Sequence, residues 1–312
     1  MNKRSIIFWV LYAGILIFLY ILSATELIIK ENEAKVYSIS ILIDGISGEN
    51  YENMKKGMDE AAYEYNVDMR FPPIAENLSL EDKVEIAKDE IEAGSKALIV
   101  GNRWKGEVES EIKKKYPELP IITLGDEGDI SLDYPDIVKL LSGNIRVAES
   151  VENEVCIVLE NLKNGDEAKL NEELTEKLEM LGYKVKTAEG AGPKLEKQLD
   201  MFNRNKTIFV SLDKDSSSRV VKYVIDNGFS TNNTKIYTVG ATDYLLGKLE
   251  DGEITGIIGW NEYDMGYLIV EKLMKKIKNK KENNKDVIEA FFVTGNDLKN
   301  EKYIKILYPI SG

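Results

Sequence analysis

The fold is decided by residues 37–71, which read YSISILIDGISGENYENMKKGMDEAAYEYNVDMRF. The stretch begins with an apolar run at 37–43, rich in isoleucine, which is typical of a buried strand. In residues 52–66 the apolar side chains recur at three-to-four spacing, which predicts a helix with one face in a core. A second apolar run at 67–71 completes a strand–helix–strand unit, and such units build parallel sheets.

The same alternation continues along the chain. Ser79 is placed to cap a helix that has acidic residues in its first turn and ends at Gly94. Two successive sets of units predict an α/β chain with two doubly wound parallel-sheet lobes. Further strands are predicted at 96–100, 120–124, 155–159, 183–187, 207–211, 235–239 and 255–258, and further helices at 105–115, 167–181, 195–203, 216–227 and 263–278.

An N-terminal apolar segment precedes this body. Residues 5–24 contain no charged side chain and follow Lys3 and Arg4. As a helix the segment would be about 30 Å long, enough to cross the hydrocarbon core of a bilayer. The basic residues favour the cytoplasmic side. The sequence therefore predicts one N-terminal transmembrane helix and a short stalk in residues 1–35, with the body on the extracytoplasmic side of the cell membrane.

A cleaved secretory signal is the alternative for this segment. Its basic start and apolar middle fit such a signal, and Ser23-Ala24-Thr25 offers small residues near a cut. Cleavage would give a secreted form, so both interpretations place the body outside. A lipoprotein anchor does not fit, because the one cysteine, Cys156, is far from the N-terminus.

Composition excludes several classes of function. The formal net charge of −13 argues against nucleic acid as a partner, since phosphate binding needs clustered Lys and Arg. The chain has no histidine, which removes Ser-His-Asp and Cys-His nucleophile pairs and ordinary zinc sites. Cys156 lies in an apolar run and is expected to be a buried small hydrophobe. We therefore expect no catalytic residues, no metal site, no cofactor and no enzymatic activity.

Several ordered motifs carry a resemblance to a known family. They lie at 40–62, 86–100, 119–134, 207–213, 236–240, 249–254 and 291–296. In this order and spacing, over residues 36–298, the chain resembles the ribose- and galactose-type sugar-binding proteins of bacterial ABC importers, the type I periplasmic binding protein family. Gly57 matches the glycine of that family's first helix.

The resemblance implies an architecture and a mechanism. Two lobes would be joined by three hinge crossovers and would close over a small solute. The crossovers are expected near residues 146–150, 259–262 and 292–296. The N-terminal lobe would comprise 36–147 plus 261–292, and the C-terminal lobe 148–260 plus 293–312.

Candidate ligand-binding residues fall on loops or crossovers at the expected cleft. Sugar recognition uses flat aromatic faces and fixed polar groups, because an unpaired buried polar group costs about 1–3 kcal/mol. The aromatic residues could instead pack the lobe interface, and Asp133 and Asp213 could instead cap the helices that follow them. The candidates are Tyr51, Trp104, Tyr134, Trp260, Asp44, Arg103, Asp133 and Asp213.

Part of the polar cage typical of the family is missing. Asn50 replaces one of two aromatic residues, Leu212 replaces a polar residue, and Trp260 stands where glutamine is common. The leading hypothesis is a membrane-anchored binding protein for a carbohydrate or sugar-like solute. Its partner would be the membrane subunits of an ABC importer or a sensor histidine kinase. The alternative is a scaffold or interaction module with the same fold and a degenerate pocket.

Overall fold

The computed structural model describes residues 3–24, 35–46, 48–75, 78–104, 106–162, 165–202, 206–229, 233–278 and 284–309. The chain forms two compact units that divide between Val36 and Tyr37. The first unit contains helix α1 (Lys3–Ala24), whose side chains from Ile7 to Ile21 are exposed. Within the described residues, no helix meets the length and hydropathy needed to cross a membrane.

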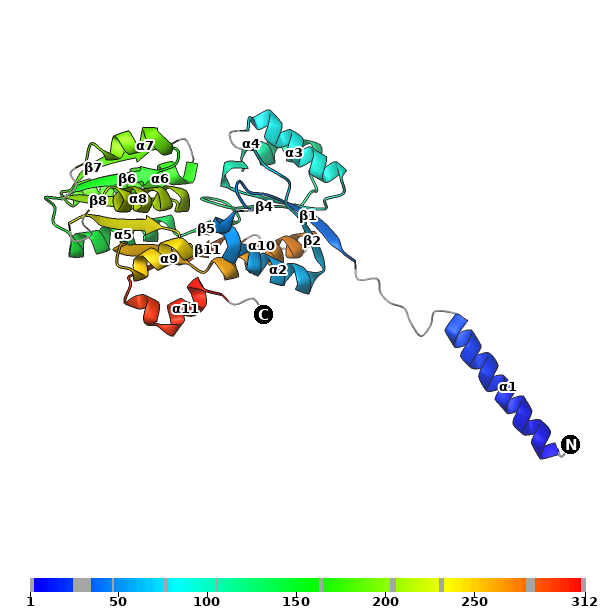
Figure 1. The fold of residues 1–312 in the computed structure, drawn as a ribbon. Coiled ribbons are helices and arrows are strands. Elements are labelled where there is room, and N and C mark those ends of the chain that lie inside the picture. Colours follow the sequence, from blue (N-terminus) through cyan, green and yellow to red (C-terminus); the bar gives the residue numbers. More distant parts are fainter. Residues whose placement is uncertain are drawn as a thin grey trace. The chain divides into compact units, whose positions relative to one another are not determined.

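In the part of the chain that the structure describes, the second unit contains two large sheets and one two-stranded sheet, and the first large sheet is parallel in the order β2-β1-β3-β4. Helices α2 and α10 cover one face and helices α3 and α4 cover the other (Figure 1). Neighbouring residues of one strand point to opposite faces, so Ile41 packs under α2 and α10 while Leu42 packs under α3 and α4. The elements are β1 (Tyr37–Leu42), β2 (Val67–Arg70), β3 (Leu98–Val100), β4 (Ile121–Thr123), α2 (Glu52–Tyr65), α3 (Leu80–Glu92), α4 (Glu107–Lys115) and α10 (Glu262–Ile277).

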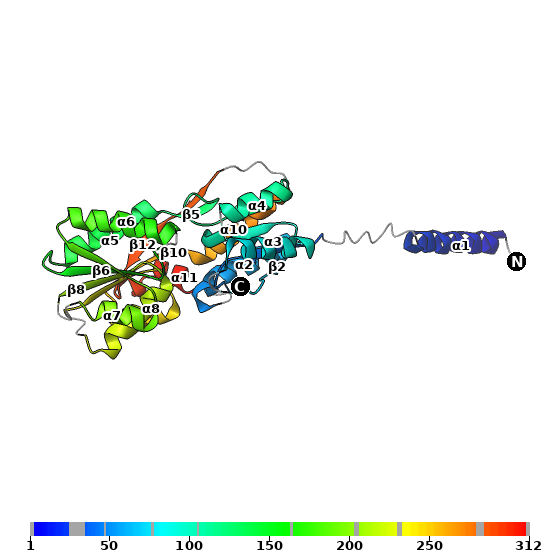
Figure 2. The ribbon, with the colours of Figure 1, turned by 90° about the horizontal axis from the view of Figure 1, so that it is seen from above.

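The second sheet has the order β12-β10-β9-β8-β6-β7 and is parallel except for β12. Helices α5 and α6 pack on one face, and α7 and α8 pack on the other (Figure 2). Helices α9 and α11 pack against the same core as α7 and α8. The strands are β6 (Glu154–Leu159), β7 (Lys184–Glu189), β8 (Thr207–Ser211), β9 (Lys235–Val239), β10 (Gly256–Trp260) and β12 (Ala290–Val293). The helices are α5 (Tyr134–Ala148), α6 (Gly165–Met180), α7 (Gly192–Leu199), α8 (Lys214–Asp226), α9 (Asp243–Glu250) and α11 (Glu301–Leu307). We call the two sheets with their helices the first and the second lobe.

Each strand and helix predicted from the periodicity is present, with ends shifted by a few residues. Ser79 caps α3 as expected: its side chain accepts a hydrogen bond from the Asp82 N–H, and the Asp82 side chain accepts one from the Ser79 N–H. The predicted start of α4 at Lys105 lies outside the described residues.

Within the described segments the chain passes between the lobes three times. Strand β5 (Ile130–Leu132) leads from the first lobe into α5, and β11 (Asp286–Ile288) leads from the first lobe into β12. These two strands pair in parallel, from Ile130 opposite Asp286 to Leu132 opposite Ile288. The third passage is at Asn261, between β10 and α10.

Two elements differ from the expected lobe boundaries. All of helix α5 except its last residue, Ala148, falls in 36–147, the range expected for the first lobe, but Ile137, Leu141 and Ile145 pack with strands of the second sheet. Strand β12 falls mostly in 261–292, yet it pairs with β10 of the second sheet. The crossovers therefore come earlier in the chain than 146–150 and 292–296, whereas the one at 259–262 is where it was expected. The hinge role of all three stays a prediction.

Helices α2 and α10 touch main chain to main chain. A Cβ atom on Gly57 would lie 1.9 Å from the carbonyl oxygen of Tyr263, and one on Gly266 would lie 1.9 Å from that of Met54. Real Cβ contacts are never this short, so any side chain at either position would push the helices apart. Gly57 is thus required by packing in the first lobe.

Candidate functional site

The lobes meet around the side chain of Lys214, the first residue of α8. Its Nζ atom lies 2.5 Å from Glu262 Oε1 and donates a 2.5 Å hydrogen bond to the carbonyl oxygen of Asn50. The same nitrogen lies 5.8 Å from the ring centroid of Tyr51 and 5.7 Å from that of Trp260. Lys214 belongs to the second lobe, while Asn50, Tyr51 and Glu262 belong to the first. We call these five residues the Lys214 cluster.

Local backbone geometry positions this cluster. Lys214 follows the end of β8, and Trp260 is the last residue of β10, so both stand at the carboxyl edge of the second sheet. In open parallel sheets this edge is where ligands bind. The Lys214 stem lies over Gly240, where a Cβ atom would come within 2.6 Å of Lys214 Cγ. A second contact crosses the same boundary, since Asn50 Nδ2 donates a 2.9 Å hydrogen bond to Asp215 Oδ1.

The ion pair in the cluster is largely removed from water. Glu262 is only 7% exposed, and the Lys214 side chain is 13% exposed. Burial raises the pKa of the Glu262 carboxyl, and the nearby Lys214 ammonium opposes that rise. Either charge left alone here would be costly, because a buried ion that loses its partner is not compensated by solvent.

A second group of polar contacts also crosses between the lobes. Asp166, at the start of α6, is 4% exposed and accepts hydrogen bonds from Tyr134 Oη at 3.0 Å and from the Asp126 N–H at 2.8 Å. Lys169 pairs with Asp126 at 2.7 Å. A Cβ on Gly125 would lie 2.3 Å from Asp166 Oδ2, so only glycine lets the loop approach this closely. We call these five residues the Asp166 cluster.

The expected aromatic residues divide between the two clusters and a core. Tyr51 and Trp260 each lie near the Lys214 ammonium, and the Tyr134 hydroxyl donates a hydrogen bond to Asp166. Burial, followed by the Asp166 charge, raises the pKa of the Tyr134 hydroxyl well above its usual value, so it remains a donor. Trp104 instead packs fully buried in the core beneath α3 and α4. Its ring presents no open face in this structure.

The expected acidic residues have structural partners. Asp133 caps α5 by accepting a 2.9 Å hydrogen bond from the Asp136 N–H. Asp44 accepts a 2.9 Å hydrogen bond from Trp104 Nε1. Arg103 lies on the turn Asn102–Trp104, and its side chain is outside the part of the chain that the structure describes.

Asp213 is the most strongly engaged of the candidates. It caps α8 and accepts hydrogen bonds from the Ser216 N–H at 2.6 Å, from Ser216 Oγ at 2.8 Å and from the Glu160 N–H at 3.0 Å. Burial raises the pKa of the Asp213 carboxyl, although these hydrogen bonds act to lower that pKa. Contact of Asp213 with a ligand stays a prediction.

Sequence reasoning did not identify Lys214, Glu262 or Asp166. Lys214 follows a predicted ligand residue directly, and Glu262 stands two places after Trp260, but their pairing joins distant parts of the chain. Among the described residues, no group of three or more acidic or cysteine side chains is placed to hold a metal ion.

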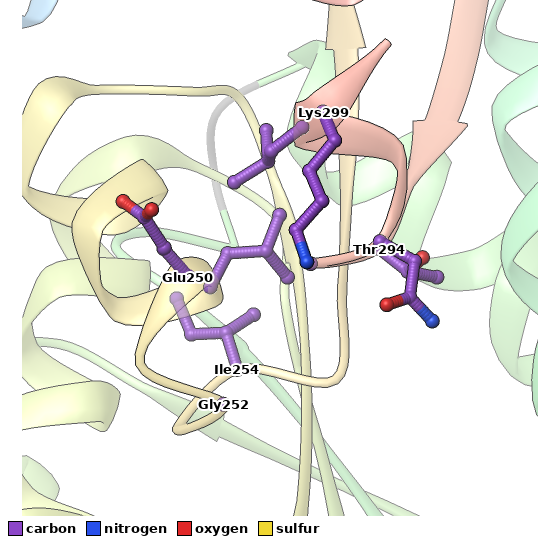
Figure 3. Close-up of a pocket in the computed structure, with 9 residues that line it drawn as sticks. Glu250, Gly252, Ile254, Thr294 and Lys299 are labelled. Carbon is purple, nitrogen blue, oxygen red and sulfur yellow. The ribbon is translucent and has the colours of Figure 1, made fainter.

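A surface pocket of about 520 Å³ lies in the second lobe, apart from both clusters. It is formed by the turn between α9 and β10 and by the segment after β12. Figure 3 shows the Lys299 side chain extending into it between Glu250 and Thr294. None of the expected ligand-binding residues lines it. The lining residues are Leu249, Glu250, Gly252, Ile254, Thr294, Gly295, Asn296, Leu298 and Lys299.

Comparison with known proteins defines the class of fold. No protein-family model matches the chain, and no curated protein matches it. A glucose-galactose binding protein, GanP, from Geobacillus stearothermophilus is 15% identical, with a TM-score of 0.73 over 85% of this chain and 99% of that one. An ABC transporter solute binding protein from Agrobacterium vitis, bound with α-D-tagatopyranose, is 16% identical, with a TM-score of 0.74 over 88% and 100%.

The third similar structure is a complex, XylFII-LytSN, in which the matching chain is 17% identical, with a TM-score of 0.66 over 84% of this chain and 99% of that one. At these identities the likeness establishes the fold. The protein has the type I fold of the sugar-binding solute-binding proteins of ABC transporters, over most of its length.

Proposed function

We propose that this protein is an extracytoplasmic solute-binding protein, not an enzyme, whose two lobes close over a sugar or sugar-like ligand. One observation carries the proposal: Tyr51 of the first lobe and Trp260 of the second face the same point, within 5.8 Å and 5.7 Å of the Lys214 ammonium. Two aromatic faces beside fixed polar groups are the elements that sugar recognition needs. The fold that this chain shares with sugar-binding proteins supports the same conclusion.

Closure would assemble the site from both lobes. Tyr51 and Trp260 would hold the faces of the ligand, and Tyr134 and Asp133 would stand near the β5 passage. Asp213 would contribute to the ligand site from the start of α8, the helix that it caps. Such closure is a two-state equilibrium that a ligand shifts by binding one state better than the other.

Anchoring to the membrane is part of the proposal. It rests on the uncharged sequence 5–24 and on the basic residues before it. The protein would then be single-pass, with its body outside, and cleavage of the segment would release a secreted form. Alkaline carbonate extraction of membranes, together with the N-terminal sequence of the mature chain, distinguishes the membrane-anchored form from the cleaved, secreted form. Recovery in the soluble cytosolic fraction would contradict both.

The closed form would be read by a second protein. The candidates are the membrane subunits of an ABC importer and the extracytoplasmic domain of a sensor histidine kinase. A similar chain occurs in the two-protein complex XylFII-LytSN, which supports a protein partner. Pull-down by the purified chain with each candidate, with and without sugar, would choose between them.

Calorimetric titration of the purified chain tests the ligand class. We expect binding of at least one of D-arabinose, D-tagatose, D-galactose or myo-inositol. Tyr51→Ala and Trp260→Ala should each weaken that binding by tenfold or more. A tenfold change in affinity corresponds to a loss of about 1.4 kcal/mol of binding free energy. Lys222→Ala, at an exposed position of α8, is the matched control. Absence of binding for every sugar would refute the proposal.

A scaffold or interaction module is the second candidate function. It is favoured by one observation: the polar groups at the lobe boundary already bond to one another, with Lys214 on Glu262 and Asn50 on Asp215. A module of this kind would bind the partner protein with equal affinity in the presence and absence of every sugar.

A further inference from the structure

The Lys214 ammonium lies where the proposed function places the solute. It lies over the rings of both Tyr51 and Trp260, at nearly equal distances from the two ring centroids. Its remaining partners, Asn50 O and Glu262 Oε1, are both hydrogen-bond acceptors from the first lobe. The side chain therefore reaches out of the second lobe and satisfies groups of the first.

This contact favours the closed arrangement of the lobes. Glu262 is nearly buried, so its attraction to Lys214 is screened less than that of a surface pair. Separating the lobes would take Lys214 away with α8 and leave Glu262 with α10. The Asn50–Asp215 hydrogen bond crosses the same boundary and would break in the same movement.

We propose that Lys214 is a built-in occupant of the candidate site: its ammonium holds the lobes closed without solute, and a solute must displace it in order to bind. The proposal rests on the proposed function for the identity of the site. It also restricts the solute. A molecule that replaces Lys214 must donate hydrogen bonds to Glu262 and to Asn50 O, so hydroxyl or ammonium groups fit and a carboxylate does not.

The distance between the lobes tests the closure directly, without any solute. Spin labels would be attached to Glu85→Cys on α3 and Lys197→Cys on α7, both at exposed positions. The native Cys156 is fully buried, and burial raises the pKa of its thiol, so it does not compete for the label. Double electron–electron resonance then reports the distribution of distances between the lobes.

The wild-type chain should show one short distance in the absence of solute. Lys214→Met keeps the aliphatic stem over Gly240 but removes the ammonium, and it should move most of the population to longer distances. Lys222→Met, on the same helix, should leave the distribution unchanged. A long wild-type distance would overturn the proposal, and so would a short distance that persists in Lys214→Met.

The Asp166 cluster provides a second comparison, because it also joins the lobes. Asp166→Asn alters that cluster and keeps Lys214 intact, so the short distance should persist. If the distance between the lobes increases in Asp166→Asn but not in Lys214→Met, the Asp166 cluster holds the lobes closed and the proposal is overturned.

Titration with D-arabinose and D-glucosamine, with D-glucuronate as the anionic comparison, tests displacement. If Lys214 occupies the site for about 90% of the time, Lys214→Met should bind the accepted sugars about tenfold more tightly. Weaker binding by Lys214→Met, or a preference of the wild type for D-glucuronate, would overturn the displacement. If no sugar binds either chain, the proposed function fails and displacement fails with it, while the distance measurement still decides the closure.

Discussion

Replacing Asp213 by alanine should destabilise the second lobe by an amount that follows from its hydrogen bonds. The carboxylate caps α8 through the Ser216 N–H and also accepts from the Glu160 N–H. Loss of an N-cap costs about 1 kcal/mol. The part-buried Glu160 N–H, left without its acceptor, adds about 1–3 kcal/mol. The free energy of unfolding should therefore fall by about 2–4 kcal/mol.

Thermal unfolding followed by circular dichroism measures this loss. At about 2 °C per kcal/mol for a chain of this size, the midpoint should fall by about 4–8 °C. Asp213→Asn keeps one acceptor oxygen and should recover part of the loss. The matched control is Asp243→Ala, an exposed acidic residue in the first turn of α9, which should change the free energy of unfolding by less than about 0.5 kcal/mol. An unchanged midpoint for Asp213→Ala, combined with loss of sugar binding, would refute this reasoning and make Asp213 a ligand residue without a structural role.

Three further predictions concern residues of the first lobe, and one of them uses Gly143 of the second lobe as its control. Gly57→Ala should lower the free energy of unfolding, measured by urea titration, by about 3 kcal/mol, because its Cβ would meet the main chain of α10 at 1.9 Å. The control Gly143→Ala in α5 has open space around its Cβ and should raise the free energy of unfolding by about 0.5–1 kcal/mol. Trp104→Phe should lower the free energy of unfolding by at least about 1–2 kcal/mol, through loss of the part-buried hydrogen bond to Asp44 and the space left in the core. Calorimetric sugar binding should stay unchanged, and a tenfold weaker affinity would return Trp104 to the ligand site. Burial alone would raise the pKa of Asp129, but hydrogen bonds and the charge of Lys276 lower that pKa below its usual value of 3.8. The stability that the Asp129–Lys276 pair contributes is therefore complete above pH 3.8 and is lost as the pH falls through the lowered pKa. The stability difference between the wild type and Lys276→Met should therefore shrink in acid, and a difference that grows below pH 3.8 would contradict the assignment.

The strand–helix units were predictable because their signals are local. A run such as 37–43 and a helix such as 52–66 carry their own periodicity, and both are present within one residue of the expected ends. The choice of lobe for a helix is not local. Residues 134–148 have one apolar face, and nothing in that face says which of two apolar sheets it will cover.

The candidate site was predictable only in part. Tyr51 and Trp260 both lie beside the Lys214 ammonium at the boundary between the lobes, and their contact with a ligand stays a prediction. Lys214 could not be found in the same way, since its partners Asn50 and Glu262 come from the other lobe and lie far away in sequence. For Asp213 the capping alternative could be read from the sequence, and the structure contains that cap.

The pairing of β5 with β11 restricts how the protein could convey its state to a partner. Two of the three strands of chain that link the lobes are hydrogen-bonded to each other in register. Neither strand can move away from the other without breaking these hydrogen bonds. If the lobes open and close as proposed, these two passages would therefore have to bend together.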